Sequence, residues 1–175
     1  MTLTRRYLLL AACAAPLATL LACSKAETAS ALVPLDINPA TTCDLDGMLL
    51  ADYGGPKAQI HYAGQALPVF FCDTVEMFAA LLRPEQVRAV RAAFVQDMGK
   101  ADWDQPRGHW LDARAGFYVV GSKRHGSMGP TFASFAAEPD ATGFAAAFGG
   151  KVLRYAEVKP DMADLSGGAL HDTRM

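Results

Sequence analysis

Met128 lies in residues 126–130, Gly-Ser-Met-Gly-Pro, where its neighbours neither favour regular structure nor shield a side chain. A methionine in such a loop can present its thioether to a soft ligand. A second pair of sulfur atoms lies far upstream, at Cys43 and Met48 on either side of Gly47. Thiolate and thioether donors together prefer Cu(I) over hard cations. Cys43, Met48 and Met128 are therefore the predicted metal ligands, provided that folding brings the two segments together.

Three further residues could complete this site. Cys72 directly precedes a predicted helix, whose positive N-terminus would lower the pKa of its thiol and suit a ligand or a nucleophile. Its apolar neighbours favour instead a buried, inert thiol. His125 stands three residues before Met128 on the same loop, and Asp46 could supply an oxygen ligand or only a turn.

The two cysteines also allow a different interpretation. In an oxidising compartment Cys43 and Cys72 could form one structural disulfide. Their spacing matches no zinc-binding pattern, and the chain has no Cys-x-x-Cys motif. The sequence leaves both the disulfide and the metal site open.

The elements that must position these residues begin with two strands, predicted over residues 56–62 and 67–72. The pattern Asp73-Thr74-Val75-Glu76 is a capping box that starts a helix, with apolar residues following at helical spacing. A third strand is expected over residues 92–97. This first unit, residues 41–100, carries the Cys43/Met48 segment.

A second unit, residues 101–160, repeats that order around the Met128 loop. Strands are predicted over residues 116–121, 131–136 and 151–158. A helix before the last strand is bracketed by Pro139 near its start and Gly149 after its end. The predicted fold class is α+β, with two pseudo-repeated ββαβ units and antiparallel sheets.

The N-terminus predicts export and a lipid anchor. Arg5 and Arg6 precede an apolar run over residues 7–21, and the segment before Cys23 resembles a bacterial lipobox. Residues 1–22 are thus a predicted signal peptide, with Cys23 the lipidated first mature residue. Ser24, rather than an aspartate, favours the periplasmic side of the outer membrane. Residues 23–40 are predicted to be a flexible tether, and residues 161–175 a disordered tail.

Composition excludes some classes of function. Removing Arg5 and Arg6 with the signal leaves 14 of the 16 basic residues against 18 acidic ones. The sequence has no stripe of basic residues of the kind that nucleic-acid-binding proteins use. The sequence also has no serine–histidine–aspartate order and no phosphate-binding glycine loop, so we predict a binding protein and not an enzyme.

Several stretches together resemble the NosL family. They are Cys43–Met48, residues 55–60, residues 97–99, residues 118–122 and residues 128–130. The resemblance spans about residues 41–158. It implies a periplasm-facing, lipid-anchored Cu(I) chaperone with two ββαβ units. It also implies that copper is delivered to apo nitrous-oxide reductase through a maturation ABC-transporter complex in the membrane.

One departure from the family pattern concerns the first motif. Many members have a cysteine two residues before its methionine, whereas this chain has Asp46 there and its cysteine at Cys43. The thiolate can still reach the metal if the segment turns at Gly47. Two alternatives remain: a periplasmic thiol–disulfide or mercury-handling enzyme using Cys43 and Cys72, and a metal-free lipoprotein interaction module.

Overall fold

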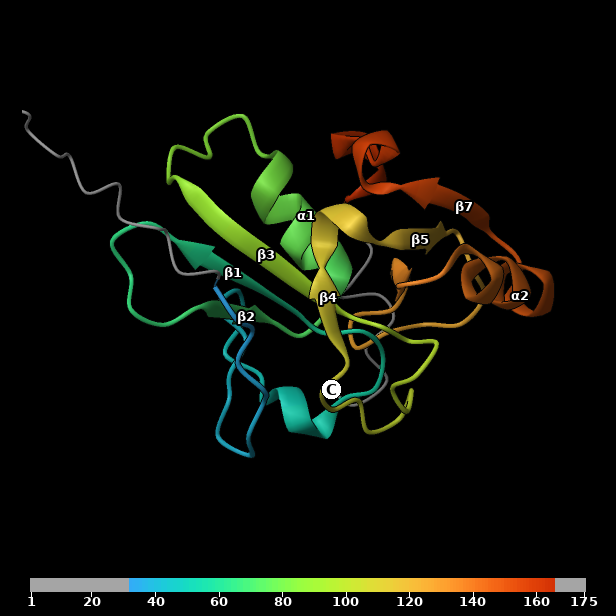
Figure 1. Cartoon of the computed structure of the whole chain (residues 1–175), viewed down its shortest axis with the longest axis horizontal. Helices are drawn as coiled ribbons and strands as arrows, with labels where there is room; N and C mark the ends of the chain where they lie inside the picture. Colours follow the sequence, from blue (N-terminus) through green and yellow to red (C-terminus); the bar gives the residue numbers. More distant parts are fainter. Residues whose placement is uncertain (1–31, 166–175) are drawn as a thin grey trace, which may run out of the picture. The chain divides into compact units, whose positions relative to one another are not determined.

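Two antiparallel sheets and two helices form the fold of residues 32–165, the part of the chain that this computed structural model describes (Figure 1). The first sheet has the strand order β2-β1-β3-β4 and the second the order β6-β5-β7. The strands are β1 (Ala58–Tyr62), β2 (Val69–Phe71), β3 (Val90–Gln96), β4 (Trp110–Asp112), β5 (Phe117–Val120), β6 (Ala133–Phe135) and β7 (Lys151–Arg154).

The predicted α+β class with antiparallel sheets is confirmed. Helix α1 (Thr74–Leu82) follows β2, and α2 (Glu138–Phe148) follows β6. In both sheets the first strand of the unit lies between the second and the last, so the two units share one order of elements. This common order fits the predicted repeat of ββαβ units.

Local signals start and end the helices where the sequence predicts. The Asp73 side chain accepts a hydrogen bond from the Val75 N–H at 3.0 Å, and the Glu76 side chain accepts one from the Asp73 N–H at 3.3 Å. These are the two bonds of a capping box. Helix α2 has a proline in its first turn and ends at Gly149, whose φ of 76° favours glycine.

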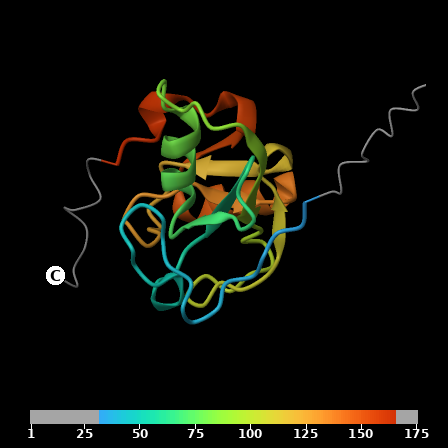
Figure 2. The same cartoon turned by 90° about the vertical axis from the view of Figure 1, so that its left-hand side faces the viewer.

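The two units share one core, with α1 between their sheets. The ring of Phe78 meets Tyr118 of β5 edge-on at 4.9 Å between centroids and lies 5.5 Å from Phe132. Thr74 Oγ1 donates a hydrogen bond to the Phe132 carbonyl at 2.5 Å. Figure 2 shows α1 (green) beside β5 (yellow). The N-terminal turn of α1 is therefore anchored to both units.

The boundary predicted at residue 100 needs correction. Strand β4 pairs with β3, with Phe94 opposite Asp112, so the first sheet continues into the predicted second unit. The last predicted strand is shorter than expected, since β7 ends at Arg154 and a 3-10 helix spans Tyr155–Glu157. Pairing across a sheet depends on contacts distant in sequence, which local patterns do not encode.

Both predicted flexible ends are ordered next to the core. Residues 32–40, here called the strap, contact β1, where Leu35 and Gln59 exchange two hydrogen bonds of 3.0 and 2.7 Å. Ile37 on the strap is 6% exposed. At the other end, Pro160–Met162 forms a 3-10 helix and Ala163 is buried. The tether and tail predictions are therefore wrong for residues 32–40 and 161–165, because apolar side chains there are buried.

Other N-terminal predictions lie outside the described residues. These are the signal peptide over residues 1–22, the lipidation site Cys23, and the remaining tether and tail residues. Within residues 32–165, no helix has the length and apolar character needed to cross a membrane.

Candidate metal centre

Cys43 lies in a tight turn that closes at Met48. The Cys43 N–H donates to the Met48 carbonyl at 2.8 Å, and the Gly47 N–H donates to the Cys43 carbonyl at 3.0 Å. Gly47 has a φ of 77°, so the segment turns there, which is the condition that the sequence analysis set for Cys43 to reach a metal. The Asp44 N–H donates to the Phe70 carbonyl at 2.7 Å, which fastens this turn to β2.

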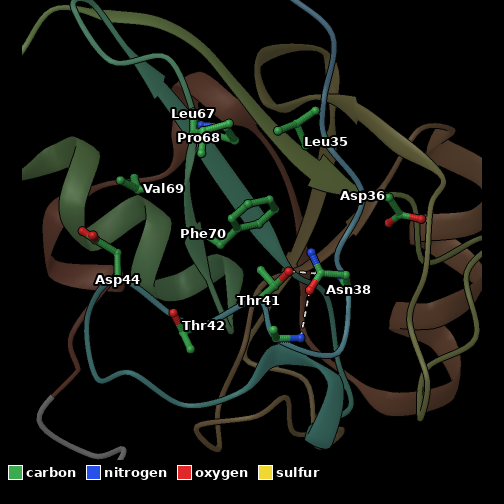
Figure 3. Close-up of a pocket in the computed structure, with 11 residues that line it drawn as sticks. Leu35, Asp36, Asn38, Thr41, Thr42, Asp44, Leu67, Pro68, Val69 and Phe70 are labelled. Carbon is green, nitrogen blue, oxygen red and sulfur yellow. Dashed lines mark hydrogen bonds between the residues drawn. The ribbon is translucent and has the colours of Figure 1, made fainter.

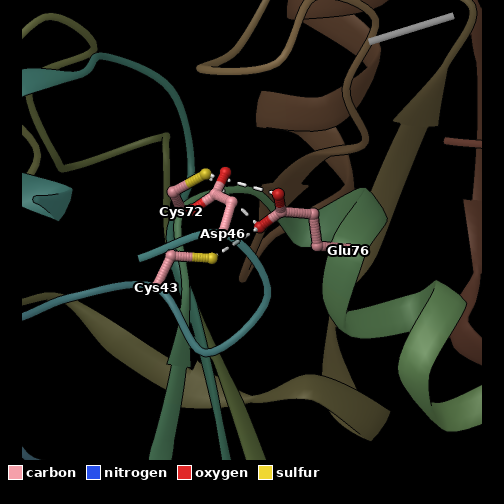
Figure 4. A group of neighbouring side chains, drawn as sticks. All are labelled: Cys43, Asp46, Cys72 and Glu76. Carbon is pink, nitrogen blue, oxygen red and sulfur yellow. Dashed lines mark hydrogen bonds between the residues drawn. The ribbon is translucent and has the colours of Figure 1, made fainter. Parts of the chain in front are cut away.

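Two thiols meet one carboxyl group at the start of α1 (Figure 4). Cys43 Sγ lies 3.3 Å from Glu76 Oε2, and Cys72 Sγ lies 3.4 and 3.3 Å from the two Glu76 oxygens. Potential ligand atoms of Cys43, Cys72, Glu76 and Asp46 all lie within 4.8 Å of one another. In this structure Cys43 and Cys72 are not joined by a disulfide, and both are buried.

Met128 reaches the same place from the second unit. It is half-buried and packs against an apolar cluster formed by Cys43, Cys72, Ile37 and Leu50. Folding therefore places residue 128 against the apolar cluster that contains both cysteines. The sequence analysis made its set of Cys43, Met48 and Met128 conditional on such a meeting of the two segments, and that ligand set stays a prediction.

The other predicted ligands have different positions. Met48 is half-buried and is not among the members of that apolar cluster in the described part of the chain. Asp46 is exposed, belongs to the group of four donors, and also accepts a hydrogen bond from the Met48 N–H at 2.9 Å. His125 is exposed and lies outside the group of four; its carbonyl accepts a hydrogen bond from Trp103 Nε1 at 3.2 Å.

Glu76 is the member of the site that the sequence analysis missed. It is 1% exposed and faces both thiols across the first turn of α1. The available signal was its spacing from Cys72, four residues apart where the helix begins. The capping box already explained why a glutamate stands at position 76, so its contact with the two thiols was not predicted.

Burial and close contact shift the pKa values of the three groups in this cluster in different directions. A hydrogen bond from Cys72 lowers the pKa of Cys43 to about 6, in spite of burial. The same contact, together with burial, raises the pKa of Cys72. Burial and then the Cys43 charge raise the pKa of Glu76 to about 8. Cys43 is therefore the member of the cluster that loses its proton most readily, whereas Cys72 and Glu76 hold theirs more firmly.

The sequence analysis left two interpretations of Cys72 open, a thiol with a lowered pKa at the helix N-terminus and a buried, inert thiol. The pKa is raised, which fits the second interpretation. Two sulfur atoms buried this close cannot both carry a negative charge at low cost. The pKa is lowered at Cys43 first by the hydrogen bond from the Cys72 thiol and then by backbone N–H groups, among them that of Leu45 at 3.4 Å.

A separate open groove of about 440 Å³ runs along the edge strand β2, between the strap and the Cys43 turn (Figure 3). It contains no thiol and no basic side chain, so it lacks the donors of the sulfur site. Its lining residues are Leu35, Asp36, Asn38, Ala40, Thr41, Thr42, Asp44, Leu67, Pro68, Val69 and Phe70.

The buried carboxyl groups predict how stability depends on pH. Burial raises the folded-state pKa of Glu76 to about 8 and that of Asp73 to about 7, above their ordinary values of 4.5 and 3.8. Between about pH 5 and pH 6 the folded chain thus binds more protons than the unfolded chain. The free energy of unfolding of the reduced, copper-free protein is expected to fall as the pH rises through this window.

Urea unfolding at several pH values measures this effect. In Glu76→Gln the fall should be shallower by about 1.4 kcal/mol per pH unit, the value for one proton. Glu138→Gln, at an exposed position on α2, is the matched control and should keep the wild-type slope. An unchanged slope in Glu76→Gln would show that this carboxyl group is already ionised in the folded protein.

Fold and site together define an α+β protein with antiparallel sheets and a buried pair of thiols beside a carboxyl group. The sequence profile of the NosL family matches residues 34–163. The copper-binding lipoprotein NosL of Achromobacter cycloclastes is 41% identical over 153 residues, covering 85% of this chain and 79% of the relative. The protein of the same name from Stutzerimonas stutzeri is 37% identical over 154 residues, covering 85% and 80%.

A solved structure agrees with these sequence matches. The crystal structure of the copper chaperone NosL from Shewanella denitrificans aligns with a TM-score of 0.70 at 34% identity, covering 74% of this chain and 97% of that chain. The chain belongs to the NosL family, as its resemblance indicated. None of the names of these relatives describes a catalyst.

Proposed function

We propose that this protein is a lipid-anchored Cu(I) chaperone on the periplasmic side of a bacterial membrane, held by Cys23 at the outer membrane. The observation that carries the proposal is the buried Cys43–Cys72 pair, with Met128 packed against the apolar cluster that contains both cysteines. Two thiols and a thioether are a donor set that favours Cu(I), whereas harder cations prefer oxygen ligands. The names of the relatives support copper as the cargo.

The protonation of the cluster suits capture of a monovalent soft ion. Cys43 is the anionic ligand at neutral pH, so it can bind Cu(I) without first losing a proton. Met128 adds a neutral sulfur, and Cys72 can join after giving up its proton. Glu76 is a poor ligand while it remains a carboxylic acid. A few sulfur ligands hold the ion and leave room for another donor.

Transfer to a partner then proceeds by ligand exchange. Asp46 is the exposed member of the group of four donors, so the side of the site at Asp46 is the open one. A sulfur or imidazole of the partner binds the ion before the chaperone's ligands leave, and no free ion is released. By the family resemblance, the acceptors are apo nitrous-oxide reductase and its maturation ABC-transporter complex.

A Cu(I) titration of the reduced protein without residues 1–23 tests this function. We expect about one Cu(I) to bind per chain in competition with a chromogenic chelator, and Zn(II) to bind much more weakly, because zinc gains little from a thioether. Zinc binding as strong as copper binding would contradict the proposal. Absence of any metal binding would favour the metal-free interaction module.

A thiol enzyme is the second candidate, because Cys43 and Cys72 lie close together beside an acid. A thiol–disulfide or mercury-handling enzyme would need both cysteines equally and would not need Met128. Comparing single substitutions of the three residues therefore separates an enzyme from a chaperone.

The anchor has its own test. Cys23→Ser is expected to move the exported protein from the membrane fraction to the soluble periplasmic fraction, because a lipid and not a spanning helix holds it. Immunoblots of the two fractions measure this shift. A variant that stays in the membrane fraction would indicate an uncleaved N-terminal helix.

A further inference from the structure

Lys57 is a fully buried cation directly behind the sulfur cluster. Its side chain is 0% exposed, and Nζ lies within hydrogen-bond distance of three oxygens. These are the Gly54 carbonyl at 2.8 Å, the Cys72 carbonyl at 2.9 Å and Ser127 Oγ at 3.3 Å. The three N–H donors of the ammonium group are thus matched by three neutral acceptors. Burying a charged group without a carboxylate partner costs free energy, so a buried lysine here indicates that its ammonium group has a specific function.

The three acceptors come from segments that are distant in sequence. Gly54 lies in the turn before β1, Cys72 at the end of β2, and Ser127 on the Met128 loop. Ser127 Oγ also donates to the Cys72 carbonyl, so Lys57 and Ser127 bind the same oxygen. The residue before Met128 is thereby tied to the backbone of Cys72.

Further contacts hold the Met128 loop in place. The Gly126 N–H donates to the Gly129 carbonyl at 2.8 Å. Gly55, with a φ of 81°, packs so closely that a Cβ there would lie 2.6 Å from Gly126 Cα. The loop is therefore packed against the turn before β1, although its glycines alone would suggest freedom.

The charge of Lys57 also suits this location. Burial lowers its pKa to about 8, while the nearby Asp73, Cys72, Glu76 and Cys43 act in the opposite direction. Negative charge on any of these four groups would favour the charged form of the Lys57 side chain. The side chain can hold the cluster together without occupying a ligand position.

We infer that Lys57 is a positioning residue of the copper site: through Ser127 and the Cys72 carbonyl, it sets the place of Met128 relative to the two thiols before copper arrives. This inference rests on the proposed function. A preformed site avoids the cost of ordering a loop when the ion binds, and outer contacts of this kind commonly change metal affinity by about 10- to 100-fold.

A double-mutant cycle on the mature chain, purified in detergent, tests the inference. Lys57→Met should weaken Cu(I) binding by about tenfold, at the lower end of that range. In a Met128→Leu background, Lys57→Met should cause almost no further loss, because the group that Lys57 positions no longer binds. Losses that multiply in the double variant would overturn the inference. Lys151→Met removes the same charge at an exposed position of β7 and should leave affinity unchanged.

A second variant and a copper-independent measurement guard against misfolding of Lys57→Met. Ser127→Ala removes one acceptor and leaves the core intact, and it should show the same coupling to Met128→Leu. Amide hydrogen exchange at Gly126 in the copper-free chain should be slow in the wild type and faster in both variants. Unchanged exchange would overturn the inference. A wild-type chain that binds no Cu(I) would instead overturn the proposed function itself.

Discussion

Replacing Cys43 with serine is expected to lower the affinity for Cu(I) by about 100-fold, roughly 3 kcal/mol. Cys43 is the sulfur that is ionised at neutral pH, so the substitution removes both the charge that neutralises the ion and its strongest soft donor. The side chain is 3% exposed, and serine is smaller than cysteine, so the fold should survive. Chelator competition at one pH measures the loss, and circular dichroism checks folding.

Cys72→Ser provides the matched comparison for this prediction. It removes the same atom type from the same cluster, but from the thiol whose pKa is raised. We expect a smaller loss, because Cys72 must release a proton before it can act as a thiolate ligand. Equal losses in the two variants would count against Cys43 as the anionic anchor and towards the thiol-enzyme alternative.

Met128→Leu should weaken Cu(I) binding by about tenfold, roughly 1.4 kcal/mol. Leucine keeps the size and apolar character with which Met128 packs against the apolar cluster that contains both cysteines, but it cannot donate a sulfur lone pair. The unfolding free energy should therefore change little while the affinity falls. Under copper limitation, reduction of nitrous oxide by host cells should fall as well.

Met98→Leu is a suitable control for the thioether. Met98 is half-buried and packs against the core of the second sheet, away from the sulfur cluster. Its substitution should leave copper affinity at the wild-type value. An unchanged affinity in Met128→Leu would show that Met128 is not a copper ligand and would contradict the chaperone proposal. The two thiols would then be either an enzyme site or an inert pair.

Much of the fold could be predicted from the sequence because its signals are local. The capping box at Asp73 and Glu76 starts α1, and Gly149 ends α2 as expected. The hydrophobic pattern also indicated most strands near their observed positions, and hence the α+β class. Strand β4 was missed, since its place beside β3 depends on a partner 18 residues away in sequence.

For the site, residue types alone indicated a soft metal. Cys43 and Met128 stand in turn and loop sequences, where a core role explains them poorly, and Gly47 indicated the turn that directs Cys43 inward. These properties belong to short segments and need no knowledge of the rest of the chain. They establish which chemistry is possible, but not which donors meet.

Tertiary structure alone decided that Cys43, Cys72 and Glu76 come together. The fold decided, too, that Met128 packs against the apolar cluster containing both cysteines, and that Lys57 is buried. It also decided which thiol is ionised, because a pKa depends on burial and on neighbouring charges rather than on residue type. In the sequence alone, nothing distinguishes Lys57 from other polar residues next to a strand. Only the fold brings the carbonyl of residue 72 and the hydroxyl of residue 127 to it, since contacts between segments this distant arise from packing and not from local pattern.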